Sequence, residues 1–302
     1  LFLRGAAVTI GLKDVELTIF YSQNKVDANV VQSSDSLENP SELVVSSFQT
    51  SGFHRTPAEL FDKDAISQQF TGAHLEWKTR RVQLGLSALD ARWNSDVERN
   101  LQLYNQFELN SEQSQVAGMD YAAVIRNFNF FGETGLSSNG GWGTVNGVMA
   151  ALNQALSIAV VNRHYERDFH SPLGNPFMEG SRPANESGTY IGAALRLNQK
   201  WHINTYADFY DYRWLKFAVD APSQGRENLT QLTYKPSRRA EFYARWRTKS
   251  KWRNYSTGDA EITVPLPSDR QNFRINASFQ AHPNIRLKSR VEWVNFQLEG
   301  QE

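Results

Sequence analysis

The stretch that decides the fold is Ile285-Arg286-Leu287-Lys288-Ser289-Arg290-Val291-Glu292-Trp293, in which apolar or small residues alternate with charged ones. Successive side chains of a β-strand point to opposite faces of the sheet, so this period of two predicts a strand with one apolar and one charged face. The two faces should carry different side chains: Leu287, Val291 and Trp293 on one, and Arg286, Lys288 and Arg290 on the other.

The same alternation occurs elsewhere in the chain. Residues 15–22 and 273–280 also place an apolar residue at every second position. Signals for helices are scarce by comparison. The sequence therefore predicts an all-β fold.

The predicted links between strands alternate between short and long. Seven short links fall near residues 13–14, 79–80, 126–127, 153–154, 198–200, 235–237 and 282–284. Six longer polar links fall near residues 33–67, 95–112, 136–142, 171–187, 218–227 and 256–268. Because a hairpin places consecutive strands side by side, this order predicts about fourteen antiparallel strands in an up-and-down arrangement.

The alternation of link lengths separates two kinds of β protein. A soluble sandwich mixes loop lengths at both ends, whereas outer-membrane barrels have short turns on the periplasmic side and long loops outside. No apolar run approaches the roughly 18 residues of a membrane helix, but a barrel strand needs only about 10 residues of alternating character. We therefore expect residues 1–302 to form a single segment of a transmembrane antiparallel up-and-down β-barrel in a bacterial outer membrane.

This topology also bears on the two ends of the chain. If the short links are periplasmic, the first and last strands both have their free ends outside the cell, whereas complete bacterial barrels begin and end in the periplasm. Residues 1–5 show no initiator Met, basic region or cleavage site of a signal peptide. We therefore expect a fragment of a barrel of about sixteen or more strands, with an N-terminal periplasmic part outside this chain.

Aromatic residues make up 12% of a chain that is only 40% hydrophobic. Rings with one apolar side and one wet side are enriched where a membrane meets water. Most of the eight Trp lie near the ends of predicted strands, which predicts an aromatic girdle. Its candidate members are Trp77, Trp93, Trp201, Trp214, Trp246 and Trp293. The alternative is that these are ordinary aromatic residues of a sheet.

Composition argues against several classes of function. The 32 Lys and Arg balance the 32 Asp and Glu, unlike in a strongly basic nucleic-acid-binding chain. The absence of Cys excludes disulfide scaffolds, cysteine metal sites and thiol catalysis. The six His follow no metal-binding pattern, and the glycine-rich residues 140–147 lack the lysine of a phosphate loop. We therefore expect no catalytic residue, metal or cofactor, and we interpret Asp208 and Asp211 as polar lumen residues.

One group of charges has no local balance. Between residues 235 and 253 there are eight Lys and Arg but a single acid, Glu241. Together with the charged face of 285–293, they predict a basic wall inside the barrel, formed by Arg245, Arg247, Arg286, Lys288 and Arg290. Such a wall attracts phosphate or an anionic polymer. The alternatives are a lumen balanced by other charges, or contact with anionic lipopolysaccharide.

Five phrases spread over most of the chain are loop and strand-end signatures: residues 3–9 (LRGAAVT), 53–60 (FHRTPAEL), 131–137 (FGETGLS), 181–188 (SRPANESG) and 219–223 (VDAPS). They resemble the C-terminal barrel region of Bacteroidota outer-membrane proteins that carry a competence-type helix-hairpin-helix domain. The resemblance implies an outer-membrane barrel. In that group the helix-hairpin-helix part precedes the barrel, so any contact with nucleic acid is expected only through a domain outside this chain.

Three functions remain open at this point. The first is a non-enzymatic outer-membrane protein, a conduit or a subunit of a larger cell-envelope complex, in contact with outer-membrane lipids, lipopolysaccharide and other envelope proteins. The second is a pore for uptake or translocation of DNA or another polyanion. The third is a barrel enzyme such as a lipase or protease, which requires a nucleophile beside His, and no such grouping stands out. The first is our prediction, and the second is its alternative.

Overall fold

The computed structural model describes residues 3–32, 43–49, 51–255 and 264–298. Over these ranges its main sheet has fourteen strands: β1 (Gly5–Leu12), β2 (Val15–Val26), β5 (Ile66–Lys78), β6 (Val82–Trp93), β7 (Gln113–Ile125), β8 (Phe128–Ser137), β9 (Trp142–Ala151), β10 (Leu156–Tyr165), β11 (Glu186–Arg196), β12 (Trp201–Tyr212), β13 (Ser223–Ser237), β14 (Ala240–Tyr255), β15 (Val264–His282) and β16 (Ile285–Leu298). The connection between β2 and β5 contains β3 (Ala28–Gln32), β4 (Leu43–Phe48) and the short helix α1 (Pro57–Phe61). No helix in the described ranges is long and apolar enough to cross a membrane.

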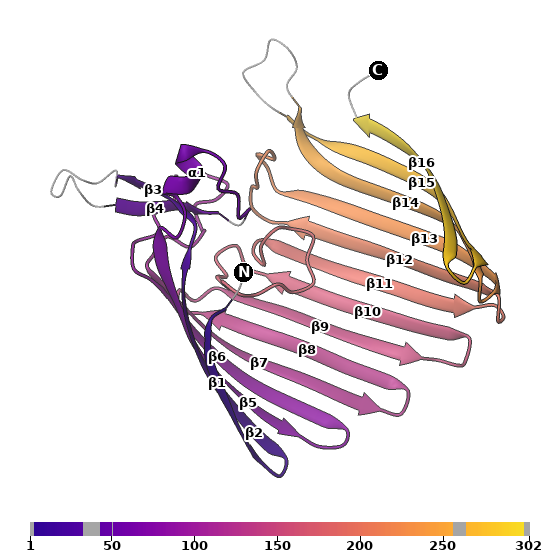
Figure 1. The fold of residues 1–302 in the computed structure, drawn as a ribbon, viewed down its shortest axis with the longest axis horizontal. Helices are drawn as coiled ribbons and strands as arrows, with labels where there is room; N and C mark the ends of the chain where they lie inside the picture. Colours follow the sequence, from indigo (N-terminus) through magenta and orange to yellow (C-terminus); the bar gives the residue numbers. More distant parts are fainter. Residues whose placement is uncertain (1–2, 33–42, 50, 256–263, 299–302) are drawn as a thin grey trace.

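The strands of the main sheet follow one another in chain order, apart from the separate hairpin of β3 and β4 (Figure 1). Neighbouring strands are antiparallel from β1 and β2 through to β15 and β16. Among the described residues, the edge strands β1 and β16 each pair on one side only. The predicted all-β fold, with about fourteen antiparallel up-and-down strands in this piece, is confirmed. The hairpin of β3 and β4 was not expected.

Short and long connections alternate along the sheet as predicted, except that the connection between β8 and β9 is also short. Short turns follow β1, β5, β7, β9, β11, β13 and β15, and Figure 1 shows them along one edge of the sheet. Several predicted long links differ in their bounds: β8 and β9 are joined by 138–141 only, β10 and β11 by 166–185 rather than 171–187, and β12 and β13 by 213–222 rather than 218–227, and β15 begins at Val264, inside the link predicted at 256–268. Residues 33–42 of the link predicted at 33–67 and residues 256–263 of the link predicted at 256–268 lie outside the described residues.

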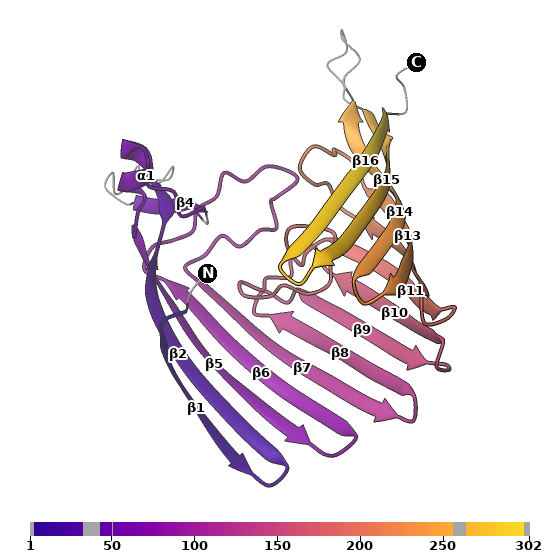
Figure 2. The same cartoon turned by 45° about the vertical axis from the view of Figure 1, so that its right-hand side comes forward.

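The sheet has two chemically different faces. Residues directly opposite each other on paired strands lie on the same face, so each face can be followed from strand to strand. The outer face, as we call it, carries a row of seven residues: Ile158, Ala193, Thr205, Thr230, Trp246, Phe273 and Trp293. The inner face is the opposite one and carries Arg163 and Arg247. Figure 2 shows the sheet bent into a trough, with connections from the long-loop edge folded over its hollow.

Large apolar side chains are exposed along the outer face. They include Val8, Ile10, Leu12, Ile19, Leu75, Leu86, Met119, Ile191, Phe209, Ile275, Leu287 and Val291. In β16 the register places Leu287, Val291 and Trp293 on this face and Arg286, Lys288 and Arg290 on the inner face, as the period of two predicts. Polar residues therefore concentrate on the face toward the hollow of the trough.

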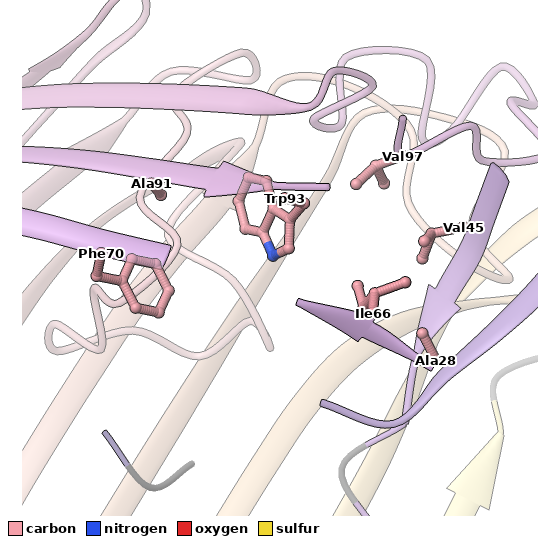
Figure 3. Packing of buried hydrophobic residues seen from close by; sticks show 7 residues of the cluster. All are labelled: Ala28, Val45, Ile66, Phe70, Ala91, Trp93 and Val97. Atoms are coloured by element: carbon pink, nitrogen blue, oxygen red, sulfur yellow. The ribbon is translucent and has the colours of Figure 1, made fainter. Parts of the chain in front are cut away.

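A small hydrophobic core lies where the hairpin of β3 and β4 packs on the ends of β5 and β6. Figure 3 shows its members: Ala28, Val45, Ile66, Phe70, Ala91, Trp93 and Val97. Trp93 is only 6% exposed, contacts Phe70 with 6.5 Å between the ring centroids, and donates from Nε1 to Gln68 Oε1 at 3.3 Å. Trp93 is therefore a core residue, and its prediction as a girdle residue is wrong.

Candidate functional site

A buried ion cluster lies on the inner face where β10, β11 and β12 run side by side. Arg163 donates from Nε to Glu186 at 2.6 Å, and from its two terminal nitrogens to the Asp208 carboxylate at 2.8 and 3.1 Å. The side chains of Arg163 and Glu186 are fully buried. Position 188, next to Arg163 on β11, requires glycine because a Cβ there would lie 2.7 Å from the guanidinium carbon. The cluster joins three neighbouring strands through charged hydrogen bonds.

The connection 166–185 is fixed on top of this cluster. The backbone N–H groups of Glu179 and Gly180 donate to the Glu186 carboxylate at 2.7–3.0 Å. The ring of Phe177 covers the buried guanidinium, with 5.0 Å from the ring centre to the guanidinium carbon. The connection therefore folds over the inner face instead of projecting away from the sheet.

A second ion cluster continues across β12, β13 and β14. Glu227 accepts hydrogen bonds from Tyr206 Oη at 2.5 Å and from Arg247 at 2.7 and 2.8 Å. The Lys249 ammonium lies 3.0 Å from the same carboxylate and also pairs with Glu179. Because Glu179 belongs to the connection 166–185, that connection is linked to both ion clusters.

Beside the second cluster the inner face contains a cavity of about 370 Å³ across β12 to β16. Its lining residues are Tyr206, Leu229, Arg245, Arg247, Arg270, Asn272, Arg274 and Glu292. The pairing of the strands brings these residues together from three adjacent rows of one face. We call this cavity the arginine pocket.

The arginines of this pocket differ in their partners. Arg247 is paired with Glu227, and Arg274 with Glu292. Arg245 instead donates to the amide oxygen of Gln231, and Arg270 donates to that of Asn272. Across the described ranges, no carboxylate lies within ion-pair distance of either of these two guanidinium groups. The pocket therefore has an uncompensated positive charge.

The structure brings only part of the predicted basic wall together in one site. Arg245 and Arg247 line the arginine pocket. Arg286, Lys288 and Arg290 are on the same inner face but nearer the short turn of β16, where Lys288 lies opposite Ser278, Arg290 lies opposite Asn276, and Arg286 donates to Ser278 Oγ at 3.0 Å.

Sequence reasoning missed two groups of residues at the site. Glu227 ends the segment 218–227, which was interpreted as a loop, but β13 already begins at Ser223. Arg270 closely follows the segment 256–268, also interpreted as a loop, but β15 already begins at Val264. The spacing of Arg270, Asn272 and Arg274 at every second position was the signal that could have found the pocket. Arg163 and Glu186 meet across paired strands and leave no local pattern in the sequence.

Asp208 and Asp211, both interpreted from the sequence as polar lumen residues, lie on opposite faces of β12. Asp208 is bound to Arg163, whereas Asp211 lies on the outer face 3.9 Å from Arg213. The two carboxylates do not form a pair, and the interpretation of Asp211 as a lumen residue is wrong because its side chain is on the outer face. No group of three or more His, Cys, Asp or Glu in the described part of the chain is arranged to hold a metal ion.

The remaining girdle candidates lie in three environments. Trp77 and Trp201 are on the outer face at the short-turn edge, and Trp201 stacks on Tyr234 with 4.4 Å between ring centroids. Trp246 and Trp293 are on the outer face but near the middle of their strands, each opposite Phe273. The predicted position near a strand end is therefore wrong for Trp246 and Trp293.

Trp214 does not lie on a strand. It belongs to the connection 213–222, where its Nε1 donates to the carbonyl of Leu103 at 2.8 Å and its ring contacts Phe107 at 5.4 Å between centroids. Its prediction as a girdle residue is wrong, because the connections 94–112, 166–185 and 213–222 pack together into a loop cap. Arg167 joins this cap, with its guanidinium carbon 4.4 Å from the ring centre of Phe107.

The loop cap also holds one lysine against an aromatic ring. The ammonium of Lys216 lies 3.6 Å from the ring centre of Tyr212. Burial, together with the positive charge of Lys251, lowers the pKa of Lys216 to about 8. This side chain therefore loses its proton in mildly alkaline solution, well before an ordinary lysine.

No protein-family model matches the chain, and no curated protein matches it. Among solved structures, the chain is similar to the apoprotein form of the FrpB iron transporter from Neisseria meningitidis (F5-1 variant), with 10% sequence identity and a TM-score of 0.44. The similarity covers 97% of this chain and 59% of that transporter, so the chain spans less than two thirds of its length.

Proposed function

We propose that the chain is part of the wall of an outer-membrane β-barrel that serves as a non-enzymatic conduit with a preference for anions. The observation that carries this proposal is the separation of the two faces of the main sheet. Large apolar side chains such as Ile10, Met119 and Leu287 are 58%, 59% and 59% exposed on the outer face. Soluble proteins rarely expose apolar patches of more than a few hundred Å², whereas hydrocarbon covers such a face at no cost.

Closure of the sheet follows from the same proposal. An open sheet edge leaves backbone N–H and C=O groups without partners, and such edges do not occur in the hydrocarbon region of a membrane. β1 and β16 must therefore pair with further strands or with each other in the membrane. A barrel of about sixteen or more strands meets this requirement with an even number of strands. The short turns would then face the periplasm, and the loop cap the outside of the cell.

The charge of the inner face sets the expected selectivity. The arginine pocket lies on the inner face, and the chain places Arg286, Lys288 and Arg290 there as well. Charges in a confined aqueous space act together when they lie within about 8 Å, the screening length at physiological salt. The interior is therefore expected to concentrate anions relative to cations.

The test is the reversal potential of the full-length protein in a planar bilayer under a salt gradient. We expect anion preference in the wild type and cation preference in the double variant Arg245→Glu with Arg290→Glu, because both positions face the lumen. The matched control is Thr248→Glu, on the same strand as Arg245. Thr248 is on the outer face, where it lies opposite the polar Gln271, so this variant should leave the selectivity unchanged. Conduction without ion preference, or an unchanged reversal potential in the double variant, would contradict the proposal.

A second candidate function, uptake of DNA or another polyanion, also draws on the basic inner face. It predicts binding of DNA by the full-length protein with a steep dependence on salt, because each phosphate contact releases counterions. Weak binding with a shallow slope would exclude this alternative and retain the conduit for smaller anions. A protein that never conducts would instead favour a structural subunit of an envelope complex.

A further inference from the structure

We propose that the arginine pocket is a binding site for a small phosphorylated organic molecule. This inference deepens the proposed conduit function, on which it rests, by naming the class of solute that the barrel interior selects. Three separate observations support it: like charges opposite each other, the total charge of the pocket, and its size and lining.

The first observation is the pairing of like charges across β14 and β15. Arg245 lies directly opposite Arg274, and Lys249 lies directly opposite Arg270. Like charges in directly opposite positions destabilise a sheet, and here two such pairs occupy the same face two rows apart. An anion bound between them converts this repulsion into attraction. Arg274 and Lys249 are paired with carboxylates whereas Arg245 and Arg270 are not, so one guanidinium of each like-charged pair is left for an anion to neutralise.

The second observation is the charge of the pocket and its immediate partners. Five cationic side chains converge there: Arg245, Arg247, Lys249, Arg270 and Arg274. Three carboxylates pair with some of them: Glu179, Glu227 and Glu292. Two positive charges remain in excess. A phosphate monoester carries a charge of about −1.5 to −2 at neutral pH, so it matches this excess.

The third observation concerns donors and size. Arg270 donates only from Nε, to Asn272, so both of its terminal nitrogens have no hydrogen-bond partner among the described residues. A planar guanidinium can bind two phosphate oxygens at once. The 370 Å³ of the pocket falls in the range of small-molecule sites, about 300–1,000 Å³, and exceeds what a simple ion needs. Tyr206 and Leu229 give it a ring and an apolar wall for the organic part of a ligand.

The test is calorimetric titration of the full-length protein in detergent with glucose 6-phosphate as probe, and with glucose and inorganic phosphate for comparison. We expect saturable binding of glucose 6-phosphate, weaker binding of inorganic phosphate and none of glucose. In the double variant Arg245→Gln with Arg270→Gln, affinity for glucose 6-phosphate should fall at least about tenfold, because two charged hydrogen-bond donors are removed.

The matched control is Arg286→Gln with Lys288→Gln. It removes the same charge from the same inner face but outside the pocket, so the affinity should change by less than about threefold. Urea unfolding checks that the pocket variant folds. Because this variant lacks the opposing like charges, its urea midpoint should be at least as high as that of the wild type. Added glucose 6-phosphate should raise the urea midpoint of the wild type but not of the pocket variant.

Two results would overturn the site. One is the absence of saturable binding of glucose 6-phosphate, and the other is an equal loss of affinity in the two double variants, which would indicate only a diffuse basic field. Because binding is measured without conduction, the two proposals fail separately. A protein that binds the probe but never conducts loses the conduit and keeps the site, whereas anion-selective conduction without binding loses the site alone.

Discussion

Replacing Arg163 with Met is expected to lower the free energy of unfolding by about 3–5 kcal/mol, because it removes one partner of a buried ion cluster. The carboxylates of Glu186 and Asp208 would face each other on neighbouring strands without the guanidinium that both now accept from. The loss extends to the connection 166–185, whose Phe177 ring packs over that guanidinium. Urea unfolding in phospholipid vesicles, followed by Trp fluorescence, measures the difference.

A triple variant shows whether the stability lost in Arg163→Met comes from the charge imbalance or from the loss of packing. Arg163→Met combined with Glu186→Gln and Asp208→Asn removes the net charge while keeping similar volumes. Replacing a complete buried ion cluster by neutral groups is often close to neutral for stability, so most of the lost stability should return. If the single variant costs less than about 1 kcal/mol, the cluster behaves like an exposed ion pair and does not hold the three strands together.

The sequence predicts strands well where one face of the sheet is apolar and the other polar. The stretch 285–293 has this character, and the register of β16 follows it. Toward the long-loop edge of the sheet, both faces carry polar residues, so apolar and polar residues no longer alternate along the strand. Asp269 and Gln271 place polar residues on the outer face of β15, so the apolar alternation begins only at Phe273 and Arg270 was overlooked.

Contacts between distant segments explain the other differences. Trp93 ends a strand, as a girdle residue would, but the hairpin of β3 and β4 brings Val45 from about fifty residues earlier and buries the ring. Trp214 is likewise drawn into the loop cap by Leu103, more than a hundred residues away. Whether a ring at a strand end meets lipid or another loop depends on the path of those loops, for which the local sequence has no signal.

The face that meets lipid can be tested with one pair of neighbouring alanines on β11. Ala193 lies on the outer face between Ile158 and Thr205, and Ala194 lies on the inner face between Ser157 and Asn204. The parent residue, the strand and the depth are thus nearly identical, and only the face differs. Ala193→Arg is expected to cost about 2–4 kcal/mol of barrel stability, the cost of an arginine facing lipid near the middle of the bilayer.

Ala194→Arg is expected to change stability by less than about 1 kcal/mol, because its guanidinium enters an aqueous lumen beside neutral polar side chains. The comparison is made by urea unfolding of the full-length protein in vesicles of one lipid composition. The cost at position 193 should also decrease in vesicles of shorter-chain lipids, where the arginine head reaches the interface more easily. If both arginines are tolerated equally, or if position 194 carries the cost, the outer face does not meet hydrocarbon and the membrane-barrel proposal is lost.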